Sequence, residues 1–150
     1  SYVKMNAVRA EKYAAMKAAG YRLVSYVSSR CRYLSQTPPG DNCFILEDNT
    51  IQPFVTIGNN VTLWSGNHIG HDATIEDHCF LTSHVVVSGY VRIGTRSFIG
   101  VNATLRNSIT IAPQTLVGAG AIIMKDTKPK GVYMPERAKL FDKSSDEIDL

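Results

Sequence analysis

The sequence predicts an all-β core, a parallel β-helix built from a six-residue repeat and preceded by a short helix–strand segment. Three observations support this fold class. Aliphatic residues occupy every sixth position without interruption from Ile45 to Ile123. Glycine follows several of them, and the position two residues before each is usually small or β-branched. A period of six fits neither a 3.6-residue helix nor a hairpin array, but it fits a short strand followed by a tight corner.

Three such strands close one triangular coil of 18 residues, so residue n lies beneath residue n+18, one strand spacing (~4.8 Å) away. The aliphatic residues then form three interior columns. We expect Asn49 and Asn67, two polar residues at inward positions 18 apart, to stack as an amide ladder. Cys43 and Cys79 are interpreted as small core residues, two coils apart and too distant for a disulfide. Three cysteines, with Cys31 outside the repeat, favour a reduced, cytoplasmic protein.

The pattern divides the chain into three segments. Residues 33–124 form the β-helix domain. Residues 1–32 are expected to be the remnant of an N-terminal α/β domain or a cap on the open end of the β-helix. Within them, Asn6 as N-cap and Gly20 as C′ residue bracket a helix of about 7–19, and Tyr21 to Val27 is expected to be a strand. Residues 125–150 form a basic segment followed by a loosely held acidic tail.

Charge and hydropathy exclude two classes of partner. The net charge is +3, but every Lys and Arg lies in residues 4–32 or 92–143, and the stretch 33–91 has none. A nucleic-acid-binding protein usually spreads a basic stripe along one face, so no nucleic-acid partner is expected. No apolar run approaches the ~18 residues of a membrane span, so no membrane partner is expected either.

All four histidines fall within seventeen residues: His68, His71, His78 and His84. None occupies an inward aliphatic position of the repeat, so each is expected at the surface. Surface histidines grouped in this way are candidates for acid–base chemistry or for ligand binding.

The repeat at residues 39–124 resembles the left-handed β-helix of the hexapeptide-repeat acyltransferases. The run from Asn67 to Asp72 is similar to the segment of the lipid A pathway's UDP-N-acetylglucosamine acyltransferase that carries its His–Asp pair. Sugar acetyltransferases of the sialic-acid O-acetyltransferase type share this feature. The resemblance implies a left-handed coil, His71 as general base, Asp72 as its carboxylate, and Gly89 as the backbone donor to the acyl carbonyl. Stacking agrees, because 89 is 71 + 18, about 5 Å away.

The resemblance also implies acetyl-CoA as acyl donor, with no metal required. In the family the donor follows backbone groups above the base, and the C-terminal segment contacts its nucleotide end. The matching donor-binding residues here are Gly89, Val101, Gly118, Ala119, Arg137 and Lys139.

The acceptor implied by the resemblance is a sugar or a nucleotide-linked amino sugar. His68, His84 and Trp64 are candidates to bind it; His84 and His68 would equally suit a subunit boundary, and Trp64 a subunit face. Proteins of this class usually form homotrimers with sites between subunits, and we expect the same here.

Two other readings remain open. The γ-type carbonic anhydrases share this fold and bind zinc through three histidines, two of them four residues apart, a spacing that no His pair here shows. The second alternative is a trimeric scaffold without catalytic activity, which predicts no acetyl-CoA binding and no effect of changing His71.

Overall fold

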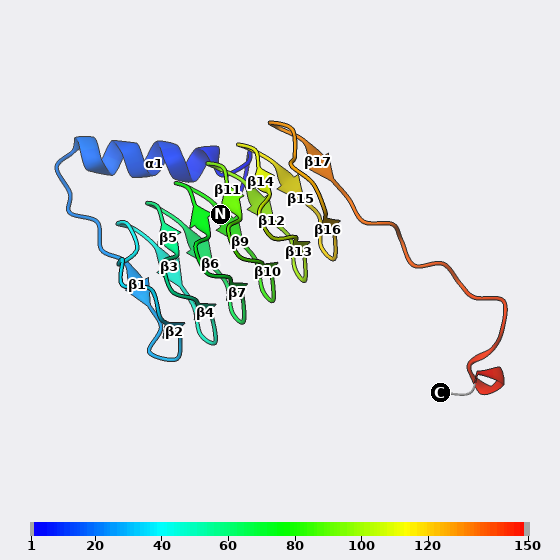
Figure 1. The fold of residues 1–150 in the computed structure, drawn as a ribbon. Helices are drawn as coiled ribbons and strands as arrows, with labels where there is room; N and C mark the ends of the chain where they lie inside the picture. The colour runs from blue at the N-terminus through cyan, green and yellow to red at the C-terminus, as the bar shows by residue number, and fades with distance from the viewer. Residues whose placement is uncertain (1, 149–150) are drawn as a thin grey trace.

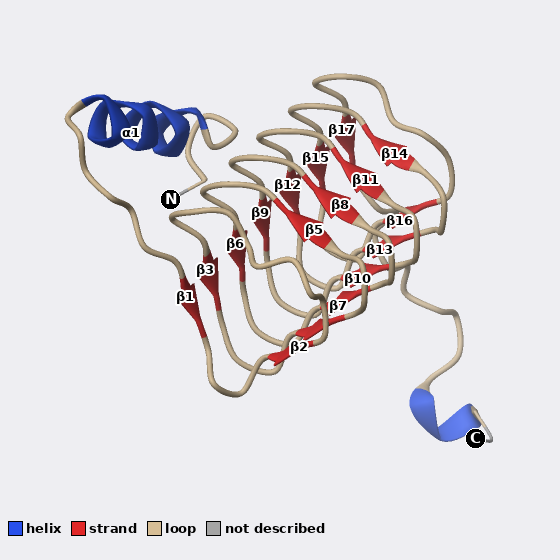
Figure 2. Ribbon diagram, turned by 60° about the vertical axis from the view of Figure 1, so that its left-hand side comes forward, coloured by secondary structure: helices blue, strands red, loops and turns tan. Residues whose placement is uncertain are grey.

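In the computed structural model, which describes residues 2–148, two-residue strands alternate with corners and wind into a parallel solenoid, a left-handed β-helix (Figures 1 and 2). The seven-stranded sheet contains β1 (Tyr26–Val27), β3 (Phe44–Ile45), β6 (Thr62–Leu63), β9 (Phe80–Leu81), β12 (Phe98–Ile99), β15 (Leu116–Val117) and β17 (Val132–Tyr133). The six-stranded sheet contains β2 (Arg32–Tyr33), β4 (Thr50–Ile51), β7 (His68–Ile69), β10 (Val86–Val87), β13 (Thr104–Leu105) and β16 (Ile122–Ile123). The four-stranded sheet contains β5 (Thr56–Ile57), β8 (Thr74–Ile75), β11 (Arg92–Ile93) and β14 (Thr110–Ile111).

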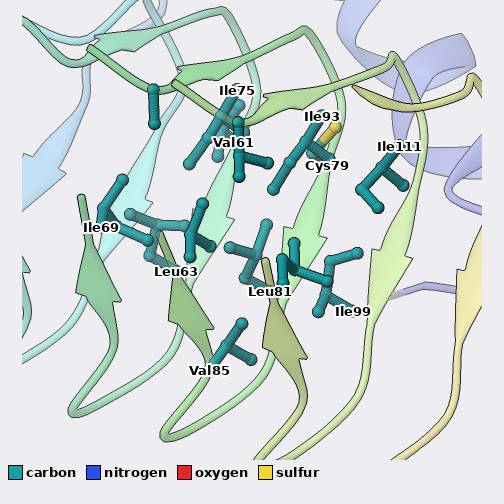
Figure 3. Packing of buried hydrophobic residues seen from close by; sticks show 14 of the residues in the cluster. Val61, Leu63, Ile69, Ile75, Cys79, Leu81, Val85, Ile93, Ile99 and Ile111 are labelled. Atoms are coloured by element: carbon teal, nitrogen blue, oxygen red, sulfur yellow. The ribbon is translucent and has the colours of Figure 1, made fainter. Parts of the chain in front are cut away.

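The predicted stacking of residue n beneath n+18 is confirmed by the strand register. In the seven-stranded sheet, Leu63 pairs with Ile45 below it and with Leu81 above it. Every aliphatic residue of the repeat is at most 6% exposed. Their side chains meet inside the coil from all three sheets (Figure 3). The burial of these three apolar columns in one continuous core stabilises strands that are too short to be stable alone.

The predicted amide ladder is also present. Asn49 and Asn67 are both buried, and the Asn67 side-chain nitrogen donates to the Asn49 Oδ1 at 2.9 Å. The Asn67 Oδ1 accepts the Val85 N–H at 2.8 Å, which carries the ladder into the next coil. Cys43 and Cys79 are buried and free, as expected for small core residues.

The corners define three edges, which position the candidate site. Edge 1, with Asp77 and His78, joins the four-stranded to the seven-stranded sheet. Edge 2 joins the seven-stranded to the six-stranded sheet and includes His84. Edge 3 joins the six-stranded to the four-stranded sheet and includes His71 and Asp72. The second residue of these corners has a positive φ, the left-handed conformation that Gly, Asn and Asp adopt most readily.

The helix α1 (Ala7–Ala18) runs along edge 1 and does not cover the open end of the solenoid (Figure 1). Polar contacts hold it there: Lys17 pairs with Asp41 at 2.6 Å, and the Arg9 guanidinium binds the Asn60 carbonyl. Asn6 is the N-cap residue, as predicted, but its side chain makes no capping hydrogen bond. That side chain is buried and donates to the Arg96 and Ser97 carbonyls, both at 3.2 Å, so it fastens the start of the helix to the solenoid.

Both ends of the solenoid extend beyond the repeat in the sequence. The expected strand Tyr21–Val27 is reduced to β1, because only Tyr26 and Val27 face a partner strand. Since β1 and β2 build the first coil, the solenoid begins before residue 33, where the sequence placed its start. At the other end, β17 pairs with β15 at an offset of 16 residues in place of 18.

After β17 the chain extends away from the solenoid and ends in a short 3₁₀ helix, η1 (Ser145–Glu147) (Figure 1). The last two residues of the expected acidic tail, 149–150, lie outside the described residues. Within residues 2–148, α1 is too short and too polar to cross a membrane, and no other helix is long enough to do so.

Candidate active site

A histidine–carboxylate pair lies at edge 3, where the chain turns from β7 to β8. The His71 Nδ1 lies 2.9 Å from the Asp72 Oδ2. A carboxylate can only accept a hydrogen bond, so Nδ1 carries the proton, and in the neutral form of the ring Nε2 is the nitrogen without one. Asp72 adopts φ 57°, a conformation that its short polar side chain tolerates. Half of the His71 side chain (51%) is exposed, so Nε2 is accessible to a substrate.

Gly89 lies directly above His71, as the stacking predicted. A Cβ built on Gly89 would lie 2.7 Å from the His71 Nε2, closer than van der Waals contact allows. The absence of a side chain at residue 89 is therefore what leaves room for the imidazole. The same absence exposes the Gly89 backbone beside the atom that would act as base.

The N–H of Gly89 is free to bind a ligand. One coil below, the corresponding N–H of His71 donates to the Gln52 Oε1 at 2.9 Å. The residue equivalent to Gln52 in the next coil is Gly70, which has no side chain to offer. Among residues 2–148, the Gly89 N–H donates no hydrogen bond. An unpaired donor next to an unprotonated imidazole nitrogen is an arrangement suited to acyl transfer.

A second feature lies at edge 2. Val101 and Ala119, predicted to bind the donor, line an apolar groove of about 370 Å³ together with Trp64, a predicted acceptor-binding residue. Tyr2, Phe80 and Phe98 line it as well. The Val101 and Ala119 N–H groups, like that of Gly89, donate no hydrogen bond within the described part of the chain. Within one chain this groove and His71 therefore occupy different edges, separated by the six-stranded sheet.

At position 118 the structure explains the glycine by the packing of the C-terminal segment. Its N–H donates to the Tyr133 carbonyl at 2.8 Å, so it is not available to a ligand in this arrangement. A Cβ at Gly118 would lie 2.8 Å from the Met134 sulfur, so glycine allows the C-terminal segment to pass closely. Arg137 and Lys139 follow in that segment and are exposed. The chain after β17 extends away from the solenoid (Figure 1).

The other three histidines do not converge on His71. His68 lies on β7, half-buried in the six-stranded sheet, and His84 is exposed at edge 2. At edge 1, the His78 Nδ1 accepts from the Asn60 side chain at 2.9 Å, and burial lowers the pKa of His78. Within residues 2–148, no three His, Cys, Asp or Glu side chains come together as a metal site would require.

Sequence reasoning missed three features of these sites. Gln52 satisfies the His71 N–H, a role visible only once the corner geometry is known. Tyr90, one coil above Asp72, packs its ring against the His71 imidazole with centroids 5.0 Å apart. The same n+18 relation that identified Gly89 points to Tyr90. The edge 2 groove depends on Tyr2, which no periodicity connects to the repeat.

Two family models match adjacent parts of the chain. Residues 55–89 match the bacterial transferase hexapeptide (six repeats), and residues 90–125 match the hexapeptide repeat of succinyl-transferase. Both matches lie within the solenoid, and the first includes His71, Asp72 and Gly89.

Sequence and structure comparisons point to similar proteins. The chain is 27% identical over 74 residues to the acyl-[acyl-carrier-protein]–UDP-N-acetylglucosamine O-acyltransferase of Burkholderia lata, a match of 49% of this chain and 28% of that protein. The chain thus matches only about a quarter of that relative's length. The acetyltransferase domain of PglB from Neisseria gonorrhoeae superposes with a TM-score of 0.84 at 22% identity, over 93% of this chain and 68% of that one. PerB from Caulobacter crescentus, solved with CoA and GDP-perosamine, has a TM-score of 0.82 at 23% identity, over 87% and 63%.

Proposed function

We propose that this chain, a hexapeptide-repeat protein with the left-handed β-helix fold, transfers an acetyl group from acetyl-CoA to a sugar acceptor. The observation that carries the proposal is the contact at edge 3. There the Nε2 of His71 lies against Gly89, whose N–H is unpaired within the described residues. A base and an oxyanion donor side by side are the two groups that direct acyl transfer requires.

In the proposed mechanism, His71 acts as general base. Nε2 takes the proton from the amine or hydroxyl of the acceptor while that atom attacks the thioester carbonyl. Asp72 holds the ring in the required tautomer and stabilises the imidazolium that forms. The new bond joins the acceptor atom to the carbonyl carbon, and the negative charge develops on the carbonyl oxygen.

Gly89 supplies the donor for that oxygen. Its N–H stabilises the oxyanion, a contribution of about 3 kcal/mol to the barrier. Collapse of the tetrahedral intermediate breaks the C–S bond, and the CoA thiolate takes the proton from the imidazolium. No acyl-enzyme forms in this scheme. Cys43 and Cys79 face the core, and burial raises the pKa of both thiols, to about 12 for Cys79.

The edge 2 groove suits the pantetheine arm of the donor. Its apolar walls fit the alkyl parts of the arm, and the unpaired N–H groups of Val101 and Ala119 suit its amide carbonyls. Because the base is on edge 3, one subunit cannot bring both together. We therefore place the site between subunits of a homotrimer, with edge 3 of one subunit facing edge 2 of the next. In that assembly Arg137 and Lys139 remain candidates for the nucleotide phosphates of the donor.

The acceptor is proposed to be a nucleotide-linked amino sugar. PerB holds GDP-perosamine together with CoA, and the Burkholderia relative acts on UDP-N-acetylglucosamine. His68, His84 and Trp64 remain candidates for acceptor contacts, with His84 and Trp64 contributed from edge 2 of the neighbouring subunit. The proposed mechanism does not require a metal ion, and we expect the enzyme to be active without one. We also expect it to be cytoplasmic.

The test is CoA release from acetyl-CoA in the presence of UDP- and GDP-linked amino sugars and of free glucosamine. Calorimetric titration with acetyl-CoA accompanies it. Turnover with at least one acceptor, unchanged by a chelator, supports the proposal. Binding of neither acetyl-CoA nor any acceptor would favour the scaffold, and activity lost on chelation and restored by zinc would favour the metalloenzyme.

A further inference from the structure

Two exposed aromatic rings flank the His–Asp pair at edge 3. Phe54 lies one coil below Asp72 and Tyr90 one coil above it, at the same position of the corner. Their backbones adopt φ 65° and 60°, and the residues are 69% and 60% exposed. An exposed large side chain in left-handed backbone is unfavourable twice over, through steric strain and through hydration of its apolar surface.

The other corners avoid this combination. At the corresponding position they carry Asn, Asp, Gly, His, Ser, Gln, Arg or Lys. The two bulky aromatic exceptions are both at edge 3, and they are the immediate neighbours of the proposed base pair. Strained backbone and exposed apolar rings that coincide at one place are a mark of ligand binding, because the ligand supplies the compensation.

Tyr90 is tied to the base by two contacts. Its N–H donates to the His71 carbonyl at 3.0 Å, and its ring meets the His71 imidazole edge-to-face, with planes 89° apart. A molecule resting on the outer face of the Tyr90 ring is therefore held beside Nε2 and the Gly89 N–H. Phe54 is a second exposed aromatic residue, one coil away on the other side of Asp72.

We propose that Tyr90 and Phe54 form the binding surface for the sugar ring of the acceptor, with Tyr90 the principal contact. This inference rests on the proposed function and names the acceptor contacts of that same site. One face of a hexose ring presents C–H groups that pack on an aromatic ring, while its hydroxyl or amino groups point sideways to hydrogen-bonding partners. Stacking on Tyr90 orients the ring so that one such group reaches Nε2 of His71.

A substitution at position 90 can remove the ring without disturbing the fold. In Tyr90→Asn the ring is removed, but asparagine is favoured in left-handed backbone, so the fold should be retained or stabilised. We expect the acceptor KM to rise about tenfold, with the acetyl-CoA KM within about twofold of wild type. Tyr90→Phe keeps the ring and should keep the acceptor KM. Phe54→Asn should give a smaller rise, and Gln114→Asn, the same kind of change on edge 1, should give none.

Several results would overturn the inference. An unchanged acceptor KM in Tyr90→Asn, in an enzyme that His71→Ala still inactivates, would refute the aromatic surface and leave the proposed function intact. An effect seen with UDP-glucosamine but absent with free glucosamine would assign the rings to the nucleobase and refute the sugar contact. Loss of the oligomer in sedimentation would assign Tyr90 to subunit packing. If wild type turns over no acceptor, or if His71→Ala turns over the acceptor as fast as wild type, the proposed function fails and this inference fails with it.

Discussion

The Nε2 atom of His71 occupies the space that a side chain on Gly89 would fill. A Cβ at residue 89 would lie 2.7 Å from that nitrogen, so the glycine and the imidazole fit only as a pair. The relation follows from the repeat, because residues 18 apart stack at one strand spacing. It brings an imidazole nitrogen and an unpaired backbone N–H together on two successive coils without any loop insertion.

This fit makes Gly89→Ala a specific probe. The methyl group displaces the imidazole but leaves the corner intact, because the φ of Gly89 is not positive and alanine is tolerated there. We expect kcat to fall about a hundredfold, as for a catalytic group misplaced by about 1 Å. The measurement is CoA release at saturating donor. Asn107→Ala, the same corner position one coil higher, should keep wild-type activity, and equal kcat values in the two variants would refute the pairing.

Asp72→Asn tests the orientation of the base. Asparagine suits the left-handed backbone and its Oδ1 still accepts from Nδ1, but the charge that stabilises the imidazolium is lost. We expect kcat to fall about a hundredfold, with little change in the acetyl-CoA KM. Asp48→Asn is the matched control, since Asp48 is also an exposed corner aspartate with positive φ, but on edge 2. A similar kcat for both variants would show that Asp72 only supports its turn.

The amide ladder predicts a stability effect separate from catalysis. Asn67→Ala leaves the buried Val85 N–H without its acceptor, removes one of the two Asn67 donors to the Asn49 Oδ1, and opens a small cavity. We expect the free energy of unfolding to fall by about 3 kcal/mol, measured by urea denaturation. The exposed Asn107→Ala serves again for comparison, with a change under about 0.5 kcal/mol. A ladder variant as stable as that control would contradict the account of the core.

Stability should depend on pH through His78. Its Nδ1 accepts from the Asn60 side chain, which requires the neutral ring, and burial lowers the pKa of His78 below its usual 6.5. The unfolded chain therefore binds a proton more readily, so stability is lost as pH falls from about 6.5 through the lowered pKa. We therefore expect the Tm of the wild type to be lower at pH 5 than at pH 7. The groups that face His78 are Tyr13, Asn60, Asp77, Arg9 and Arg96.

His78→Asn is the companion variant. Asparagine keeps the positive φ and an oxygen acceptor for Asn60 but does not titrate. Its Tm should fall less between pH 7 and pH 5 than that of the wild type. The contribution of Asp41, whose pKa is lowered by the Lys17 hydrogen bond, is lost only below its usual 3.8, outside this interval. Equal drops in wild type and variant would contradict the role of His78.

The sequence predicted those structural features that are set by the six-residue repeat, and it missed those that are not. The interior columns, the Asn49–Asn67 ladder and the approach of His71 to Gly89 all follow from a spacing of 18, and the structure has each of them. The start of the solenoid at β1 was not predicted, because Tyr26 and Val27 precede the aliphatic pattern. The path of α1 along edge 1 was also beyond prediction, since it depends on polar contacts such as Lys17 with Asp41 that carry no periodicity.

The grouping of the candidate site residues shows the same division. Val101 and Ala119 are 30 and 48 residues beyond His71, neither a multiple of 18, so they stack on a different edge. The sequence thus contains the separation of His71 from the edge 2 groove. Tyr90 was within reach of the same counting, one coil above Asp72. The groove itself required Tyr2, whose contact with Phe98 at 5.0 Å joins distant parts of the chain.

The most direct test of the central claim is acceptor-dependent CoA release by wild type and by His71→Asn. His78→Asn serves as the control for a histidine replaced on another edge. If His71 is the general base, kcat should fall by about 10² to 10⁴ in His71→Asn, while acetyl-CoA binding and Tm stay close to wild type. His78→Asn should keep full activity at pH 7.5. Undiminished turnover in His71→Asn would contradict the account.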